Sequence, residues 1–172
     1  MSLFGGAITL AVPPSHTDAS VFREVPDNQE VFVSTTDNSS LIVELLEMER
    51  DQQDWALFHF IELASDNDAA LPADAIVART QLQLLPSMNL PSDSSIAIIH
   101  GLQFSAKFNK TEKDRVHIFL AVVRIPTVQT DLLISVNRPV DAETSEVNNE
   151  SALLDFCKLV NTIRVNDWGL FQ

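Results

Sequence analysis

The sequence predicts an α+β domain: a three-layer α/β/α sandwich built on a mostly antiparallel sheet of about six strands. Short runs rich in β-branched and aromatic residues recur along the chain, separated by Pro, Gly and polar clusters. One run, 116–125, is almost wholly apolar, which is typical of a strand covered on both faces. Helices are therefore expected on each side of the sheet.

The expected strands and helices follow from local pattern and from breakers. Strands are predicted over residues 4–12, 29–33, 75–85, 96–104, 116–125 and 130–138. Helices are predicted over 19–23 with Asp18 as the cap, over 41–51, over 55–63 and over 150–164. Polar loops are expected over 66–72, 107–114 and 141–149. Because the connection between the last two strands is short, they should be antiparallel neighbours.

Three of these elements carry further expectations. Gly101 marks a possible kink in the strand 96–104. The C-terminal helix should bury a stripe made of Leu153, Phe156, Cys157, Val160 and Ile163. Cys157 is the only cysteine, so no internal disulfide can form, which suits a reducing compartment. Its place in an apolar helical run predicts a packing role.

Length and charge narrow the class of protein. A chain of 172 residues predicts one domain over 1–172. The net charge is −13, with 13 acidic and 2 basic residues in 1–70 against 11 and 9 in 71–172. Such an acidic half disfavours nucleic acid and anionic membranes, which require clustered Lys and Arg, and favours a basic protein surface as partner. The sequence also lacks an apolar run near 18 residues and a secretory signal pattern.

The stretch 26–51 organises the chain, because a strand, a polar turn and a predicted acidic helix follow one another there. Ser39 or Ser40 is expected to cap that helix. Helical spacing gathers its apolar residues on one side, namely Leu41, Ile42, Leu45 and Met48. Glu44, Glu47 and Asp51 then share the opposite side, with Arg50 off to one side. This acidic face has two interpretations, a merely solvated surface or a preformed anionic patch that docks a basic partner.

The sequence contains none of the common motifs of catalysis or nucleotide binding. GxSxG, GxxxxGK[ST], GxGxxG and HExxH are all missing, and the four histidines have no metal-ligand spacing. His100 and His117 lie on adjacent predicted strands, where half-buried histidines satisfied by hydrogen bonds are expected. No catalytic residue, cofactor or metal site is therefore predicted.

Four short strings of residues extend the prediction beyond the class of the fold. The strings are FGGA at 4–7, VPDNQEVF at 25–32, SLIVELLE at 40–47 and RIPTVQTDLLISVNRP at 124–139. In this order they resemble the Ran guanine nucleotide release factor family, the Mog-type Ran-binding proteins. The loops at 64–74 and 107–114 and the C-terminal helix carry little of this resemblance.

The resemblance implies a fold, a partner and a site. The family fold is a six-stranded antiparallel sheet between helices, like that of the photosystem protein PsbP. The family binds the small GTPase Ran, promotes loss of its bound guanine nucleotide and regulates nuclear protein import. It acts without catalytic residues or a cofactor of its own, and a monomer in the nucleus and cytoplasm is expected. The family's acid-x-x-acid pair maps onto Glu44 and Glu47.

Further acids extend this implied Ran-binding surface. Asp27 and Glu30 match acidic positions of the same N-terminal surface, and Asp51 continues the predicted acidic face. Two other classes stay open from the residues alone. One is a small-molecule-binding α+β sandwich without a GTPase partner, with a pocket near His100 and His117. The other is an enzyme built from dispersed carboxylates.

Overall fold

The computed structural model describes residues 1–106, 113–140 and 149–171. Its main sheet has seven strands in the order β3-β4-β5-β9-β8-β7-β6, and every neighbouring pair is antiparallel. The strands are β3 (His16–Asp18), β4 (Gln29–Ser34), β5 (Ser40–Glu47), β6 (Ile76–Leu82), β7 (Ser95–Ala106), β8 (Lys113–Ile125) and β9 (Thr130–Pro139). The predicted α+β class is confirmed, with one more strand in this sheet than expected.

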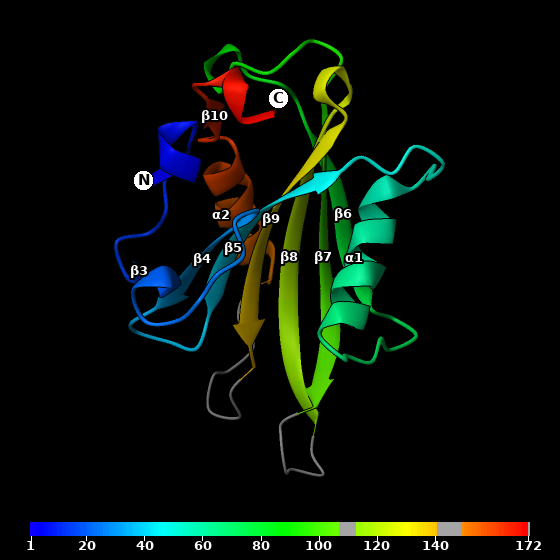
Figure 1. The fold of residues 1–172 in the computed structure, drawn as a ribbon. Helices are drawn as coiled ribbons and strands as arrows, with labels where there is room; N and C mark the ends of the chain where they lie inside the picture. Colours follow the sequence, from blue (N-terminus) through cyan, green and yellow to red (C-terminus); the bar gives the residue numbers. More distant parts are fainter. Residues whose placement is uncertain (107–112, 141–148, 172) are drawn as a thin grey trace.

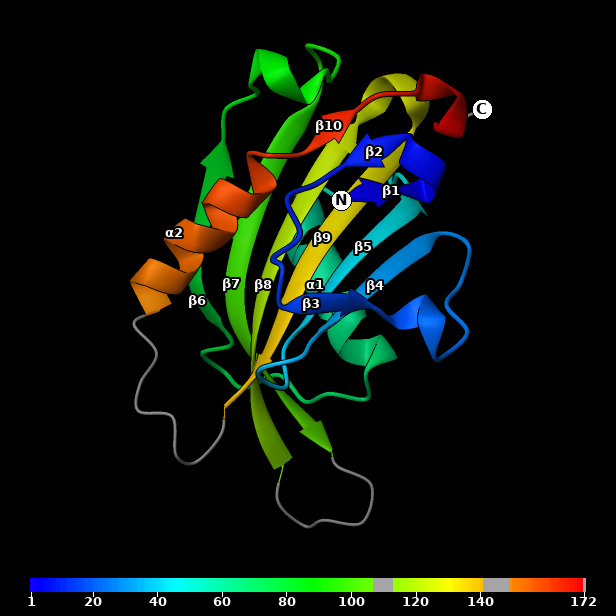
Figure 2. The same ribbon diagram turned by 90° about the vertical axis from the view of Figure 1, so that its left-hand side faces the viewer.

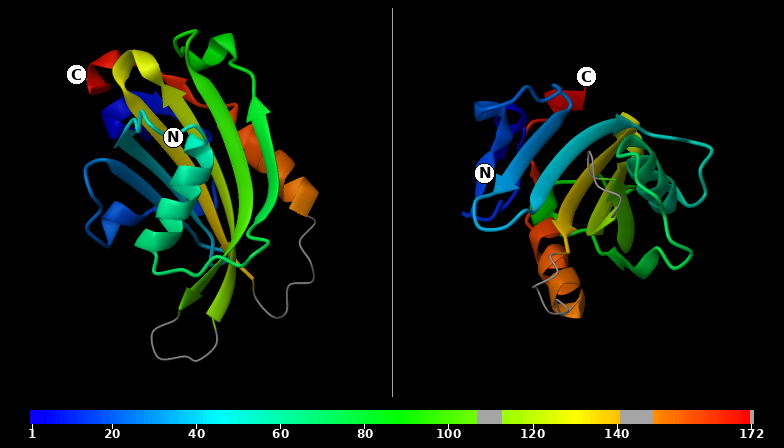
Figure 3. Two further views of the ribbon diagram at one scale, coloured as in Figure 1. Left: turned by 90° about the vertical axis from the view of Figure 1, so that its right-hand side faces the viewer. Right: turned by 90° about the horizontal axis from the view of Figure 1, so that it is seen from below.

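Two α-helices cover opposite faces of the sheet. Helix α1 (Trp55–Asp66) packs on one face, and α2 (Asn149–Val160) packs on the other (Figures 1 and 3). A small three-stranded sheet lies on the α2 side, where β1 (Ser2–Leu3) and β10 (Arg164–Val165) flank β2 (Ile8–Thr9) (Figure 2). Five 3₁₀ turns complete the described chain: η1 (Phe4–Gly6), η2 (Ala19–Val21), η3 (Pro86–Met88), η4 (Pro126–Val128) and η5 (Trp168–Phe171).

The sheet separates two apolar clusters. On the α2 side, Phe32, Leu41, Phe119 and Phe156 belong to the larger cluster. On the α1 side, Phe60 packs with residues of β7, β8 and β9. The central strand β8 contributes to both, and residues 118–123 are all buried. The prediction that 116–125 is a strand covered on both faces is therefore confirmed.

The predicted helix over 41–51 is wrong, because 40–47 form β5 and 48–51 lie in the connection to α1. Leu41 and Val43 are buried in the cluster under α2, whereas Leu46, on the other side of the strand, packs toward α1. Apolar side chains on both sides suit a strand between two neighbours, and β5 pairs with both β4 and β9. The expected serine cap is also absent, since Ser39 instead donates hydrogen bonds to Asp37 in the turn between β4 and β5.

The predicted strand over 4–12 is confirmed only at Ile8–Thr9, which forms β2, and is wrong at Phe4–Gly6, which forms η1. Phe4, Gly5 and Gly6 have φ values of 49°, 65° and 99°, so the chain reverses between β1 and β2. Glycine adopts such left-handed conformations without the steric cost that a Cβ brings. The reversed segment joins the small sheet, and β3 is the edge strand of the main sheet.

The remaining predictions hold with shifted ends. The brief helix after Asp18 is η2, and Asp18 accepts the expected capping bond from Ser20 N. The C-terminal helix ends at Val160, so the buried Ile163 lies beyond it. Strands β8 and β9 are antiparallel neighbours as predicted. The expected loops over 107–114 and 141–149 lie largely outside the described residues.

Gly101 sits where Phe60 of helix α1 packs against the sheet. A Cβ at this position would overlap Cζ of Phe60 and would lie 2.7 Å from the backbone oxygen of Ala75. The register between β6 and β7 shifts at the same level, next to Ile76. The predicted kink at Gly101 thus corresponds to a point of close packing and irregular pairing.

We predict that Gly101→Ala lowers the free energy of unfolding by about 1–3 kcal/mol, the usual cost of overpacking a core. Urea denaturation followed by circular dichroism measures it. Gly169→Ala is the matched control, because its added Cβ meets only the Asp167 side chain, at 3.1 Å. Equal stability of Gly101→Ala and wild type would contradict the described packing.

Candidate protein-interaction site

The pairing of β4 with β5 brings two distant acidic segments together at one end of the main sheet. Gln29 lies directly opposite Glu44, and Leu45 N donates a 2.9 Å hydrogen bond to the oxygen of Asn28. The start of β4 and the end of β5 are therefore neighbours. The strings VPDNQEVF and SLIVELLE form one surface region, although a turn separates them in the sequence.

Glu44 is held in place on this region. It is half-buried, and its Oε1 accepts hydrogen bonds from Gln29 Nε2 at 2.7 Å and from Asn28 Nδ2 at 3.4 Å. Asn28 Nδ2 also reaches the backbone oxygen of Leu45 at 3.2 Å. These amides orient the carboxylate without cancelling its charge. Glu44 therefore presents a preorganised negative group on the α1 side of the sheet.

Glu47 differs from Glu44 in both orientation and exposure. Because side chains alternate along a strand, residues three apart point to opposite faces. Glu47 thus lies on the α2 side, exposed, at the last position of β5 and opposite Thr130. The expectation that Glu44, Glu47 and Asp51 share one helical face is wrong for this reason. Asp51 is exposed in the connection between β5 and α1.

A shallow polar hollow of about 380 Å³ adjoins Glu47. It is lined by Glu47, Met48, Arg50, Val128, Gln129 and Thr130. Gln129 has φ 53°, at the end of η4, and Met48 N donates to its backbone oxygen at 2.9 Å. Arg50 and Glu47 thus line the same hollow, so a basic residue stands among the lining of this acidic region.

The two acids of the first segment have different environments. Asp27 is exposed in the turn that precedes β4, where Gln29 N donates to the oxygen of Pro26 at 2.9 Å. Glu30 is half-buried and accepts a hydrogen bond from Phe4 N at 2.5 Å. Glu30 therefore anchors the N-terminal turn to the sheet, which leaves its carboxylate less available to a partner than that of Asp27.

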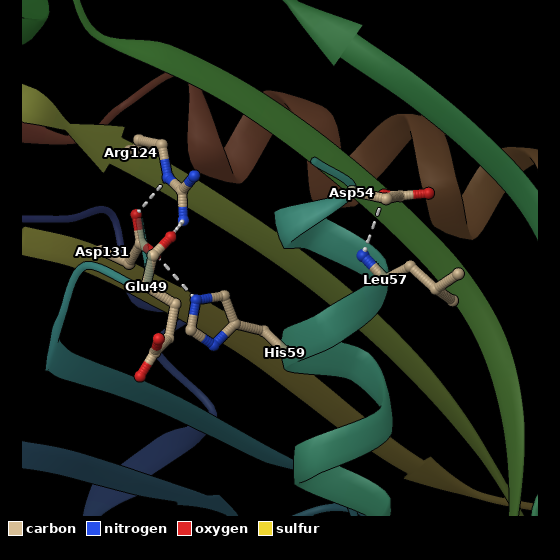
Figure 4. A network of polar contacts seen from close by, with 6 residues as sticks. All are labelled: Glu49, Asp54, Leu57, His59, Arg124 and Asp131. Atoms are coloured by element: carbon tan, nitrogen blue, oxygen red, sulfur yellow. Dashed lines mark hydrogen bonds and ion pairs between the residues drawn. The ribbon is translucent and has the colours of Figure 1, made fainter. Parts of the chain in front are cut away.

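A buried ionic network lies beneath this end of the sheet, and no pattern in the sequence predicts it. Asp131 of β9 is fully buried and meets His59 Nε2 at 2.8 Å from Oδ2. Arg124 of β8 donates two hydrogen bonds to the same carboxylate, at 2.9 and 2.8 Å (Figure 4). Burial alone raises the pKa of Asp131, but the bonds from Arg124 and His59 and their charges lower it overall.

The network also holds the connection that carries Asp51. Arg124 donates a 3.0 Å hydrogen bond to the backbone oxygen of Glu49 and lies over the Trp55 ring, 4.9 Å from its centroid. Both contacts tie the β5–α1 connection to the sheet. The pairing of β8 with β9 places Arg124 opposite Asp131, and the packing of α1 on the sheet brings His59 to the same carboxylate, so residue spacing from His59 could not have revealed the network.

The expected proximity of His100 and His117 is confirmed. His100 Nε2 and His117 Nδ1 are 2.9 Å apart, and the His100 ring stacks on Phe119 at a centroid distance of 4.2 Å. Burial, with a smaller contribution from the charge of His117, lowers the pKa of His100 to about 4. Burial also lowers the pKa of His117, together with the charges of Arg115 and Arg138.

A cavity of about 290 Å³ lies between α2 and the main sheet. Its walls include Phe119, Val136 and Phe156, and Arg138 and Asp37 stand among its polar residues. Neither His100 nor His117 lines it. Such a mixed lining fits a small amphipathic molecule, so the cavity is the structural basis for the alternative of ligand binding.

Within the described residues, no three His, Cys, Asp or Glu side chains are grouped as metal ligands would be. Cys157 is half-buried on α2, and burial raises the pKa of its thiol, which suits packing better than nucleophilic chemistry. No described helix has the length and apolar character needed to span a bilayer. The main feature of this site is thus an acidic, partly preorganised surface.

Comparisons with known proteins find relatives that align along most of this chain. The family model described as Ran-interacting Mog1 protein matches residues 1–139. The Ran guanine nucleotide release factor of Danio rerio is 33% identical over 178 residues, covering 98% of this chain and 97% of the relative. The nuclear import protein mog1 of Schizosaccharomyces pombe is 36% identical over 151 residues, covering 84% of this chain and 79% of the relative.

Solved structures agree on the fold. The crystal structure of the Saccharomyces cerevisiae Ran-binding protein Mog1p aligns with a TM-score of 0.77 at 27% identity, covering 100% of this chain and 97% of that one. Cyanobacterial PsbP from Synechocystis aligns with a TM-score of 0.59 at 11% identity, covering 96% of this chain and 90% of that one. At so low an identity, this alignment shows a shared fold alone. Fold and site together define a PsbP-like α+β protein with an acidic sheet end.

Within that class, the chain belongs to the Mog1 family of Ran-interacting proteins. The resemblance drawn from the strings at 4–7, 25–32, 40–47 and 124–139 is therefore confirmed.

We predict that Asp131→Ala lowers the free energy of unfolding by about 3–5 kcal/mol, because Arg124 and His59 would keep buried positive or polar groups without their acceptor. Urea denaturation at pH 7 measures the loss. Asp155→Ala removes an exposed carboxylate that is paired with Lys158 and should change stability by less than about 1 kcal/mol. Similar small losses in both variants would contradict the structural role of the network.

We also predict that stability falls as the pH drops from about 6.5 to about 4. In this window the unfolded chain protonates its imidazole at position 100 while the folded protein does not, so acid favours unfolding. His100→Phe should remove about 2–3 kcal/mol of this pH dependence. Urea midpoints of both proteins across the window measure it, and parallel curves would show that His100 is not responsible.

Proposed function

We propose that this protein binds the small GTPase Ran and promotes release of its bound guanine nucleotide, as a regulator of the Ran cycle in nuclear protein import. The observation that carries the proposal is membership of the Mog1 family over 1–139, together with relatives named for Ran nucleotide release that align along nearly the whole chain. The protein would act in the nucleus and cytoplasm as a monomeric regulator without catalytic residues of its own.

The acidic sheet end is the proposed contact surface for Ran. Glu44 and Glu47 are the central residues, and Asp27 and Asp51 add exposed charge on either side. Glu30 contributes less directly, because its carboxylate is engaged by Phe4 N. A negative surface of this kind attracts a basic one and accelerates encounter, and this attraction weakens as salt increases.

Release requires more than binding. A partner shifts an equilibrium only through its different affinity for the two states, so the protein must bind nucleotide-poor Ran more tightly than loaded Ran. GTPases hold their nucleotide through a lysine, backbone N–H groups and Mg²⁺. Glutamates on β5 can act either by drawing a basic side chain away from the phosphates or by competing for the metal. Raising the Mg²⁺ concentration separates the two routes, since only the second is suppressed.

The test is the release of a fluorescent GTP analogue from purified Ran, with and without this protein, at low and moderate salt. Faster release that weakens with salt is the expected result. Unchanged release together with no complex on gel filtration would overturn the proposal. It would favour the second candidate, a small-molecule-binding domain, which the cavity lined by Phe119, Phe156 and Arg138 supports.

We predict that Glu44→Gln and Glu47→Gln each slow Ran nucleotide release about tenfold, because each removes one charge of the contact surface, the equivalent of about 1.4 kcal/mol. Glutamine at position 44 can still accept the bonds from Gln29 and Asn28, so the fold should not change. Asp155→Asn on α2 removes one charge away from this surface and is the control. Wild-type release rates in both Glu variants would exclude this surface.

A further inference from the structure

Two large apolar side chains point into solvent beside the acidic sheet end. Val21 is 78% exposed and Phe22 is 61% exposed, and no other large hydrophobic residue after Met1 exceeds 57% in the described chain. A single exposed apolar residue is common, but adjacent exposed valine and phenylalanine expose a continuous apolar surface to water. Such a surface is typical of a contact point for another protein.

The local structure holds this pair outward. Asp18 caps η2 by accepting from Ser20 N at 2.8 Å, and Ala19 is fully buried beneath the turn. The N–H groups of Phe22 and Arg23 both donate to the oxygen of Ala19, at 3.1 and 3.0 Å. The turn is therefore fixed at its base while Val21 and Phe22 remain outside. A preordered apolar pair loses little conformational freedom when a partner covers it.

The pair is continuous with the proposed contact surface. After Phe22 the chain stays largely exposed through Arg23, Glu24 and Pro26 to Asp27, and then enters β4 beside Glu44. Turn η2 and the start of β4 lie along the same edge of the sheet (Figure 2). The same chain segment carries the acids Asp18, Glu24 and Asp27 and one base, Arg23. This arrangement of an apolar centre with a charged rim is that of a protein interface.

We propose that Val21 and Phe22 form an apolar anchor that inserts into a hydrophobic depression, ringed by Lys or Arg, on the protein partner of the acidic sheet end. The inference rests on the proposed function, under which that partner is Ran. The acids give the encounter its speed and orientation, and the anchor slows dissociation. Aromatic side chains in this position are common among the residues that carry most of the binding energy.

The acidic rim and the apolar anchor should affect the kinetics of binding differently. Removal of a rim charge mainly alters the association rate and its dependence on salt. Loss of a buried apolar side chain mainly raises the dissociation rate and leaves the salt dependence unchanged. Surface plasmon resonance of immobilised nucleotide-free Ran against this protein, at several salt concentrations, distinguishes them directly.

The test compares Phe22→Ser and Val21→Ser with Leu154→Ser. Leu154 is 57% exposed on α2 and is the matched control for loss of an exposed apolar side chain. Phe22→Ser is expected to dissociate 10 to 100 times faster with an unchanged salt dependence, Val21→Ser about 5 times faster, and Leu154→Ser at the wild-type rate. Phe22→Leu should restore most of the lost affinity. Thermal melting confirms that the exposed substitutions leave the fold intact.

Other outcomes have distinct meanings. If wild type binds Ran and Glu47→Gln weakens it while Phe22→Ser binds within twofold, the anchor is overturned and the proposed function stands. If wild type does not bind Ran, the proposed function fails, and with it the assigned partner of the anchor. Concentration-dependent dimers in sedimentation that Phe22→Ser abolishes would assign the pair to a second copy of this chain, and would overturn the anchor as proposed.

Discussion

The structure of the acidic sheet end depends on one constraint, which is that the buried carboxylate of Asp131 must be paired. A charge in the interior is tolerated only when opposite charges and hydrogen bonds replace the water it has lost. His59 and Arg124 supply them from α1 and β8, so helix, sheet and the Glu49 backbone must meet at one point. The network thereby fixes the position of α1 on the sheet and of the connection that leads from β5.

The antiparallel pairing of β4 with β5 fixes the positions of the acidic groups on the surface in a similar way. Because Gln29 opposes Glu44, the start of β4 and the end of β5 present their polar groups together. Amides of Asn28 and Gln29 then orient the Glu44 carboxylate, while Glu47 extends from the other side of the same strand. The result is a sheet end whose negative charges flank the strand on both faces.

Charge and apolar exposure have complementary functions under the proposed activity. Long-range attraction by a chain of net charge −13 brings a basic partner near, but it does not retain it. Retention requires desolvated contacts, and the exposed pair at Val21 and Phe22 is the feature beside the acids that provides them. Nucleotide release then depends on how strongly this combined surface prefers the nucleotide-poor partner.

The sequence by itself determined the class of the fold, the antiparallel pairing of β8 with β9 and the helix cap at Asp18, because each follows from a local pattern. It also determined the family, because that rests on characteristic strings that occur in a fixed order. It did not determine that 40–47 is a strand, because its apolar residues satisfy both helical spacing and burial on two faces. Pairing with β4 and β9, which lie far apart in the chain, decided that. The strand conformation places Glu44 and Glu47 on opposite faces. Pairing of β8 with β9 and packing of α1 on the sheet bring Asp131, Arg124 and His59 together, which the spacing from His59 along the chain does not encode.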